Sequence, residues 1–283
     1  MRGAAGLSAG VVREACCVIR SRICTLEANP QRTTVAIHYP DDGNALCAEI
    51  EDTSFWFQHR NDMILEVMRR YPPPQPLYDV GGGNGVVSAA MARAGIKAIV
   101  VEPGAAGVQK ARERGLEAIQ ATLDQAGLAE GSVPSIGLFD VLEHIEDSVG
   151  FLRQAHRLMR PGGRLYIAVP AYQWLWSGED DIAQHFRRYT ARSLAGELRE
   201  SLFEVEYTTY MFSFLTLPLW MLRTIPSRLG RSSSRMASRV RSDHQARGTS
   251  GLVRLFRRAE LEGWRKLGRM PVGTSVCAVA RRT

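Results

Sequence analysis

Paired cysteines are missing from this sequence. Its five cysteines are odd in number and form no C-x-x-C pair: Cys16, Cys17, Cys24, Cys47 and Cys277. This usage argues against a disulfide framework and a structural zinc site, and it favours a reduced, cytoplasmic protein. We expect no metal site elsewhere either, because the acids at 179–181 and His185 match no strong ligand spacing.

Long hydrophobic runs are also absent. No stretch approaches the roughly 20 apolar residues that a helix needs to cross a bilayer. The most apolar run, 211–222, is short and contains Pro218. The first 30 residues contain Arg13, Glu14 and Arg20 and no apolar core of signal-peptide length. We therefore expect neither a transmembrane segment nor a secretory leader.

Lysine is scarce, since only Lys97, Lys110 and Lys266 contribute to the 36 basic residues and the net charge of +7. Much of the basic excess lies between residues 223 and 269. Such a segment can contact nucleic acid or an anionic membrane. The simpler interpretation is a solvated segment, with an arginine bias that partly reflects the base composition of the source genome.

The most informative positive feature is a glycine loop after a short apolar strand. Leu77–Val80 ends in Asp79 and Val80, the glycines Gly81, Gly83 and Gly85 follow, and 86–94 has a helical pattern. Strand, glycine loop and helix together build a nucleotide-sized pocket in parallel α/β sheets. A dinucleotide-binding dehydrogenase is disfavoured, because Val86 stands where G-x-G-x-x-G requires its last glycine.

Further strands follow in a regular order. An apolar strand ends at Glu102, 23 positions after Asp79, and another strand covers 135–139. A helix over 151–159 is stopped by Pro161-Gly162-Gly163, and strands follow at 164–170, 203–210 and 275–280. With the run LFDVLEHIED, this block resembles the class I S-adenosylmethionine (SAM) dependent methyltransferases, and within them a bacterial small-molecule, ubiquinone-type subgroup.

The resemblance implies a doubly wound, Rossmann-like α/β fold with a seven-stranded sheet and an antiparallel final strand. N-terminal helices and a helical insertion before the last strand complete it. We expect an extension over 1–50 with a helix near 11–26, and an aromatic lid helix and proline linker over 51–76. The lid helix should cover 53–70 and start at Asp52 or Thr53. The SAM-binding core covers 77–211, a basic, amphipathic insertion 212–273, and the last strand 274–283. The insertion, with a mobile loop over 227–251, would cover the substrate pocket or form a dimer contact, so monomer and homodimer both stay open.

SAM is thus the expected cofactor and S-adenosylhomocysteine the product. Glu102 should bind the ribose hydroxyls, Asp140 should lie near the methionine part, and Arg60 should pair with its carboxylate. The adenine contacts are less regular, because Thr122 stands near the usual acid and Asp124 comes two residues later. The expected cofactor-binding residues are Asp79, Gly81, Gly82, Gly83, Gly85, Glu102, Thr122, Leu123, Asp140 and Arg60.

The acceptor side should follow the strands ending near 139 and 170. His144 and His185 are candidate bases, and Tyr189 is a third catalytic candidate. Expected substrate contacts are Tyr172, Trp174, Trp176, Arg187 and Arg188. In the alternative interpretations, His144 only hydrogen-bonds its loop, and an arginine of 187–188 pairs with the acids at 179–181 to fix the chain.

The sequence therefore predicts an enzyme that transfers a methyl group from SAM to a small-molecule acceptor, by in-line displacement with a histidine as a candidate base. Oxygen is the first choice of acceptor atom, then nitrogen or carbon. One alternative is a nucleic-acid methyltransferase, although the Asn/Asp-Pro-Pro-aromatic tetrad of amino-methylating enzymes is absent from 139–142 and no RNA-binding module is recognisable. The other is a SAM-binding protein without methyltransferase activity. A weak contact with a membrane surface is a further interpretation of the insertion.

Overall fold

The computed structural model describes residues 51, 54–228 and 251–283. The chain divides into two compact units, 1–35 and 36–283, and the described residues all belong to the second. The helix expected over 11–26, most of the loop expected over 227–251 and four of the cysteines lie outside the described residues. The remaining cysteine, Cys277, is buried as a free thiol.

A seven-stranded sheet is the centre of the described unit, with strand order β3-β2-β1-β4-β5-β7-β6. The first five strands run parallel, and β7 is antiparallel to both β5 and β6. This order confirms the predicted fold class and its antiparallel final hairpin. The strands are β1 Leu77–Val80, β2 Ala98–Glu102, β3 Glu117–Gln120, β4 Val133–Phe139, β5 Met159–Pro170, β6 Phe203–Met211 and β7 Ser275–Arg282.

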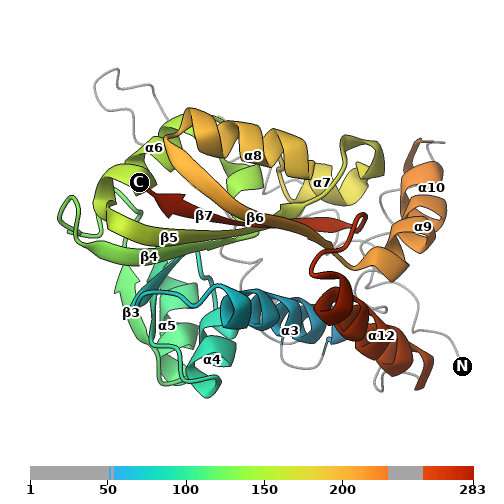
Figure 1. Cartoon of the computed structure of the whole chain (residues 1–283), viewed down its shortest axis with the longest axis horizontal. Helices are drawn as coiled ribbons and strands as arrows, with labels where there is room; N and C mark the ends of the chain where they lie inside the picture. Colours follow the sequence, from blue (N-terminus) through green and yellow to red (C-terminus); the bar gives the residue numbers. More distant parts are fainter. Residues whose placement is uncertain (1–50, 52–53, 229–250) are drawn as a thin grey trace, which may run out of the picture. The chain divides into compact units, whose positions relative to one another are not determined.

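Helices cover both faces of this sheet (Figure 1). On one face lie α6 (Ser148–Leu158) and α8 (Ala191–Glu200); on the other lie α3 (Phe55–Arg70), α4 (Val86–Arg93) and α5 (Ala105–Glu113). Every residue of β2 and β4 is buried, as expected for parallel strands covered on both sides. Two apolar cores result, one on each face.

Two element boundaries differ from the sequence prediction. Helix α3 starts at Phe55, and its N-cap is Ser54, whose hydroxyl accepts from the Trp56 N–H at 3.3 Å, rather than Asp52 or Thr53. Strand β5 begins at Met159 and includes Pro161-Gly162-Gly163, with a register shift against β4. The register with β4 passes from Met159 directly to Arg164, so residues 160–163 form an irregular, bulged entry to the strand.

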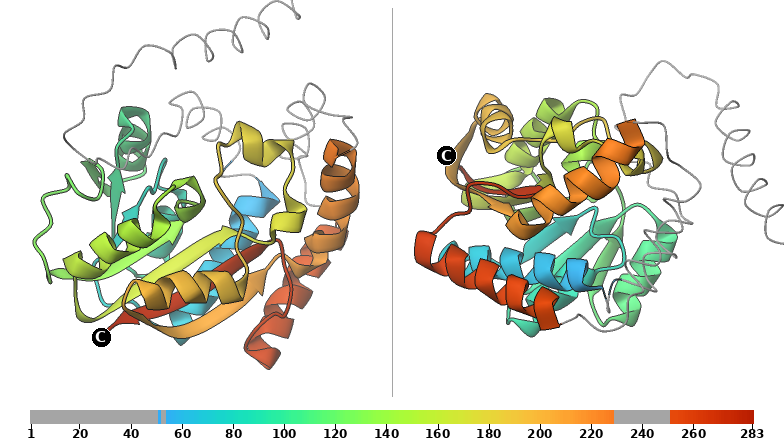
Figure 2. Two further views of the ribbon diagram at one scale, coloured as in Figure 1. Left: turned by 90° about the horizontal axis from the view of Figure 1, so that it is seen from above. Right: turned by 90° about the vertical axis from the view of Figure 1, so that its right-hand side faces the viewer.

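The helical part of the insertion returns to the sheet and packs along α3. Helix α12 (Gly251–Leu267) lies beside α3 in the right-hand view of Figure 2. A Glu260 carboxylate oxygen accepts from His59 Nε2 at 2.7 Å, Arg257 pairs with Asp62 at 2.7 Å, and Arg265 pairs with Glu66. Arg257 meets the first half of α3, Arg265 meets Glu66, and Arg70 at the end of α3 donates to the Gly268 carbonyl, so α12 runs parallel to α3.

Between β6 and α12 the chain forms short helical segments. They are α9 (Thr216–Leu219), a π-helical turn at Trp220–Thr224 and α10 (Ile225–Arg228). Leu217, Met221 and Leu222 are exposed here. Within the described ranges, every helix falls short of the length and apolarity required for a membrane span.

The Trp264 side chain should be the main anchor of α12. It is 3% exposed, and its indole N–H donates to the Tyr207 hydroxyl at 2.7 Å. We predict that Trp264→Ala lowers the free energy of unfolding by about 3–5 kcal/mol, because it creates a cavity and removes this hydrogen bond. Urea denaturation measures the effect. Leu267→Ala on the same helix is the control: its side chain is exposed, so a change within about 0.5 kcal/mol is expected.

Candidate active site

The predicted site residues come from loops at one edge of the sheet. Because β1, β2, β4 and β5 are parallel, the loops that follow them leave from the same, carboxyl-terminal edge. In open α/β sheets ligands bind outside this edge, where the strand order reverses. Here the order reverses between β1 and β4, so the glycine loop and the loop after β4 are neighbours.

The glycine loop after β1 requires its glycines. Gly81, Gly83 and Gly85 have φ of 70°, 51° and 75°, a region that glycine adopts at little cost. A Cβ on Gly81 would lie 2.7 Å from Val141 Cγ2, and a Cβ on Gly82 would lie 2.9 Å from Asp79 Cγ. The loop is thus close to both the β1 acid and the chain after β4, which keeps backbone rather than side chains at the edge.

Asp79 lies under the glycine loop and is 1% exposed. Its carboxylate accepts a hydrogen bond from the Ser88 hydroxyl on α4 at 2.7 Å. Burial raises the pKa of Asp79 to about 6, against the lowering effects of Ser88 and Arg60. Ser88 was not predicted from the sequence. The signal that could have indicated this contact is a hydroxyl residue on the next helix, nine positions after the acid.

Glu102 ends β2, and its carboxylate is held by backbone N–H groups. One oxygen accepts from Gly83 at 3.0 Å and the other from Gly104 at 2.9 Å. These two hydrogen bonds fix the orientation of the carboxylate, a group that can accept from several donors. The carboxylate is thus anchored to the glycine loop, and its contact with the ribose hydroxyls stays a prediction.

Arg60 on α3 reaches the loop after β4 and pairs with Asp140. Asp140 has φ of 58°, and its N–H donates to Ala168 at 2.8 Å, so the backbone fixes it directly beyond β4. Arg60 is 8% exposed, and its Nε has no hydrogen-bond acceptor among the described residues. A carboxylate ligand would satisfy this donor, which fits the amino-acid part of SAM.

The remaining cofactor candidates lie after β3. Thr122 donates to Asp124 at 2.5 Å, and Leu123 is 2% exposed. The hydroxyl is thus committed to its neighbour, and the adenine contacts of Thr122 and Leu123 stay predictions.

On the acceptor side, the short helix α7 (Gly178–Ile182) carries a fully buried carboxylate, Asp180. It accepts from Arg188 at 2.7 and 2.9 Å and interacts with His185 Nδ1 at 2.8 Å. Burial alone would raise the pKa of Asp180, but the hydrogen bonds from His185 and Arg188 hold it at about 2. Arg188 therefore fixes this loop, as the alternative interpretation expected, and a contact between Arg188 and the acceptor stays a prediction.

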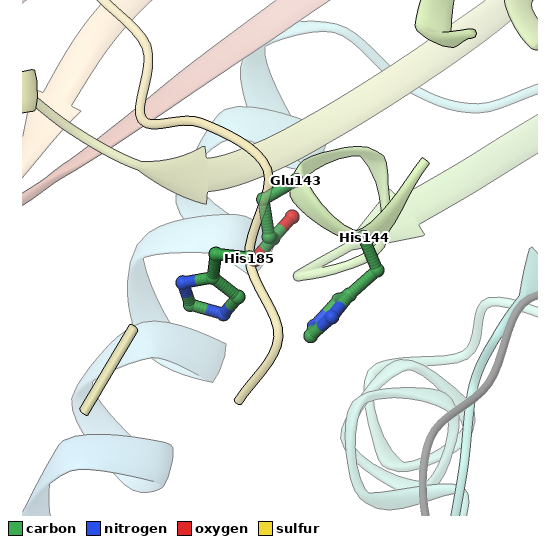
Figure 3. Close-up of side chains that lie close together, drawn as sticks. All are labelled: Glu143, His144 and His185. Atoms are coloured by element: carbon green, nitrogen blue, oxygen red, sulfur yellow. The ribbon is translucent and has the colours of Figure 1, made fainter. Parts of the chain in front are cut away.

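His185 faces two residues of the short 3₁₀ helix η1 (Leu142–His144), as Figure 3 shows. The ring centroids of His144 and His185 are 4.7 Å apart, with an angle of 74° between the ring planes. A carboxylate oxygen of Glu143 and one ring nitrogen of each histidine lie within 4.8 Å of one another. Both Glu143 oxygens are buried without a hydrogen-bond partner among the described residues. The structure thus joins two candidate bases and adds Glu143, which the sequence analysis did not select.

The protonation of this cluster follows from its burial. Burial raises the pKa of Glu143 well above its ordinary value, and the nearby Asp140 charge adds to this effect. Burial and then His185 lower the pKa of His144 to about 4, so its imidazole is neutral at physiological pH. A neutral imidazole can accept a proton or bind a metal ion.

The other acceptor candidates have mainly structural contacts. Tyr189 is 1% exposed, with its hydroxyl 3.5 Å from the Leu142 carbonyl, so burial argues against a direct contact with substrate. Arg187 donates to Ser148 at 3.1 Å and to the Glu146 carbonyl at 2.5 Å.

The aromatic candidates lie between β5 and α7. The Tyr172 ring stacks on that of the exposed Trp174 with centroids 5.3 Å apart, and the Trp176 indole N–H donates to Asp181 at 2.9 Å. Trp174 is the most accessible of these predicted contacts.

The aromatic residues of α3 are also accounted for. Trp56 stacks on Phe212 at 4.0 Å, and the Phe57 ring lies 5.2 Å from the Arg60 guanidinium carbon. The predicted lid helix is therefore fixed to the chain after β6 through Trp56.

A glycine loop after β1, an acid at the end of β2, an acid after β4 and this strand order together define the fold and cofactor site of a class I SAM-dependent methyltransferase. A family model described as a methyltransferase domain matches residues 55–208, more than half of the chain. The chain belongs to this methyltransferase family, and its cofactor is SAM.

Several known proteins are similar to this chain over part or most of its length. The ubiquinone biosynthesis O-methyltransferase of Xanthomonas oryzae is 33% identical over 98 residues, which cover 32% of this chain and 41% of that protein. The match thus spans about two fifths of the relative's length. A SAM-dependent methyltransferase of Thermotoga maritima has a TM-score of 0.52 at 17% identity, covering 85% of this chain and 97% of that one. Geranyl diphosphate C-methyltransferase of Streptomyces coelicolor gives 0.52 at 15%, covering 90% and 86%. These two structures share the fold.

The buried Asp79 predicts a pH dependence of stability. Its pKa of about 6 lies above the ordinary value of 3.8, so its contribution is present below pH 3.8 and is lost as the pH rises through about 6. Asp79→Asn stays neutral and can still accept from Ser88. Relative to wild type, this variant should gain on the order of 3 kcal/mol between about pH 4 and pH 7. Urea denaturation of both proteins across this range measures the difference. Parallel profiles would contradict the raised pKa.

Proposed function

We propose that this enzyme methylates an oxygen atom of a small acceptor with an ionisable hydroxyl group. The observation that carries the proposal is the cluster of His144, His185 and Glu143 beside Asp140, at the edge that also holds the glycine loop. The O-methyltransferase activity named for the Xanthomonas oryzae relative supports oxygen over nitrogen or carbon, over the segment that the two chains share.

The residues have distinct roles in this proposal. SAM supplies an electrophilic methyl group, which passes in line to the acceptor oxygen. Glu102 and the glycine loop bind the nucleoside part of SAM. The Arg60 guanidinium, which pairs with Asp140, orients the amino-acid part. Holding the two reactants in line accounts for much of the acceleration in such transfers.

The acceptor must lose a proton as its oxygen attacks. His185 is the better oriented of the two imidazoles, because Asp180 binds Nδ1 at 2.8 Å and leaves Nε2 to face the cluster. A buried, ionised carboxylate behind a histidine fixes its tautomer and increases the basicity of the other nitrogen. The exposed Trp174 offers a flat apolar surface for an aromatic acceptor ring.

Substitution of His185 tests this proposal. We expect His185→Ala to lower turnover by about 10²–10⁴, the usual contribution of general acid–base catalysis, with little change in SAM affinity. A screen of metabolite extracts with isotope-labelled SAM identifies the acceptor by mass shift, and the variant rates are then measured with it.

His156→Ala is the matched control, because His156 lies on α6 against Phe203, away from the cluster. It should keep the wild-type rate. Full activity in both His185→Ala and His144→Ala would sink the proposal that this cluster ionises the acceptor, while leaving the methyltransferase assignment intact.

The glycine loop gives a separate test of the cofactor site. We predict that Gly83→Arg abolishes SAM binding in calorimetry, since φ of 51° and the loop's position leave no room for a long side chain beside the ligand. Gly95→Arg carries the same backbone strain, with φ of 80°, but a Cβ there meets nothing within 4 Å. This control should retain SAM affinity. Normal binding by Gly83→Arg would refute the placement of the cofactor.

A further inference from the structure

We propose that Glu143, His144 and His185 form a binding site for one divalent transition-metal ion, for which Zn²⁺ is the best match. The inference deepens the proposed function, because it rests on the same cluster as the place where the acceptor hydroxyl ionises. From the sequence alone we expect no metal, because His185 and the acids at 179–181 match no strong ligand spacing. The structure brings together a different set.

The first support is geometric. Donor atoms of the three side chains lie within 4.8 Å of one another, although Glu143 and His144 follow β4 and His185 follows α7. In Figure 3 the Glu143 carboxylate lies between the two imidazole rings. Ligands about 2.0–2.2 Å from a central ion are separated by roughly 3–4 Å, so small side-chain rotations would complete the set.

The second support is the state of the Glu143 carboxylate. The side chain is fully buried, and both oxygens lack a hydrogen-bond partner among residues 51, 54–228 and 251–283. A buried, unpaired carboxylate is costly, and proteins normally pair such groups or use them to coordinate metals. The two imidazoles lie within 4.8 Å of this carboxylate, whereas the guanidiniums of Arg60 and Arg188 are bonded to Asp140 and Asp180.

The third support is Asp180, which orients the His185 ring. Asp180 binds His185 Nδ1 at 2.8 Å, so Nε2 is the nitrogen that remains for a metal. Carboxylate–histidine–metal arrangements of this kind recur around zinc, and their outer carboxylates affect metal affinity by 10–100-fold. The backbone N–H of Phe186, next to His185, donates to the Glu143 carbonyl at 2.8 Å and joins the two ligand-bearing loops.

The donor set identifies the class of ion. Two imidazoles and one carboxylate suit Zn²⁺ or a similar first-row ion, and this set with an open fourth position is typical of catalytic zinc. Mg²⁺ and Ca²⁺ prefer oxygen ligands and are disfavoured here. An open position would receive the acceptor hydroxyl, whose pKa the cation lowers, so that its proton passes to solvent before the oxygen takes the methyl group from sulfur. The imidazoles would then be ligands instead of bases.

Metal binding is measured first without SAM or acceptor, on the full-length protein freed of metal by dialysis against EDTA. We expect calorimetry and elemental analysis after gel filtration to give one Zn²⁺ per chain, and Co²⁺ to give the visible bands of a four- or five-coordinate site. His156→Ala should bind Zn²⁺ like wild type, because that residue lies outside the cluster. Glu143→Gln and His185→Ala should each lower the affinity by at least 100-fold, more than a second-layer substitution.

Thermal denaturation in EDTA separates lost binding from lost folding, and the nearly isosteric Glu143→Gln keeps the comparison valid if His185→Ala is unstable. A stoichiometry below one Zn²⁺ per chain in wild type, or equal affinity in wild type and Glu143→Gln, would overturn the metal site. Because the readout needs no acceptor, this result is independent of the His185→Ala rate. Methyl transfer that persists fully in EDTA would leave the proposed function standing and would also overturn the metal's role.

Discussion

The buried carboxylate of Asp180 is the constraint on which the acceptor side depends. It has no exposed surface, yet its pKa is held at about 2, so it stays charged inside the protein. Such a charge is tolerated only with complete pairing, and removal of one partner typically costs about 3–5 kcal/mol. Ser177, His185 and Arg188 supply that pairing, and they lie on both sides of α7. The chain from 177 to 188 is consequently tied around one side chain, and the direction of His185 follows from it.

The loop after β4 meets this segment from the other side. The Glu143 side chain is fully buried, and the Phe186 N–H donates to the Glu143 backbone carbonyl. This hydrogen bond joins the two loops. Asp140, three residues earlier, pairs with Arg60 of α3. One short loop therefore connects the cofactor side, through Arg60, with the acceptor side, through His185. Under the proposed function, this shared loop joins the residues that are assigned to the two reactants.

Local patterns determine most of what could be predicted. The sheet follows from buried apolar runs and the cofactor edge from Asp79, the glycines and Glu102, because each signal lies within a few residues of the structure it specifies. His144 and His185 were both selected by position after strands, but their contact depends on how two loops fold over one another. Tyr189 is a catalytic candidate and Arg188 a substrate candidate because polar, aromatic and basic groups cluster there in the sequence. Only the packing shows that Tyr189 is buried and that Arg188 is bonded to Asp180. The pairing of α12 with α3 was also out of reach, since about 200 residues separate the partners.

That pairing has a consequence for the cofactor side. His59 and Arg60 are adjacent on α3, so their side chains point about 100° apart around the helix. His59 is fully buried against Glu260 of α12, whereas Arg60 reaches Asp140. Glu260 also accepts from the Ser213 N–H at 2.7 Å, and Phe212 stacks on Trp56, so the chain after β6 joins the same contact. Rotation of α3 would have to break the His59 contact in order to move Arg60. The insertion before the last strand therefore fixes the rotational position of the helix that carries Arg60.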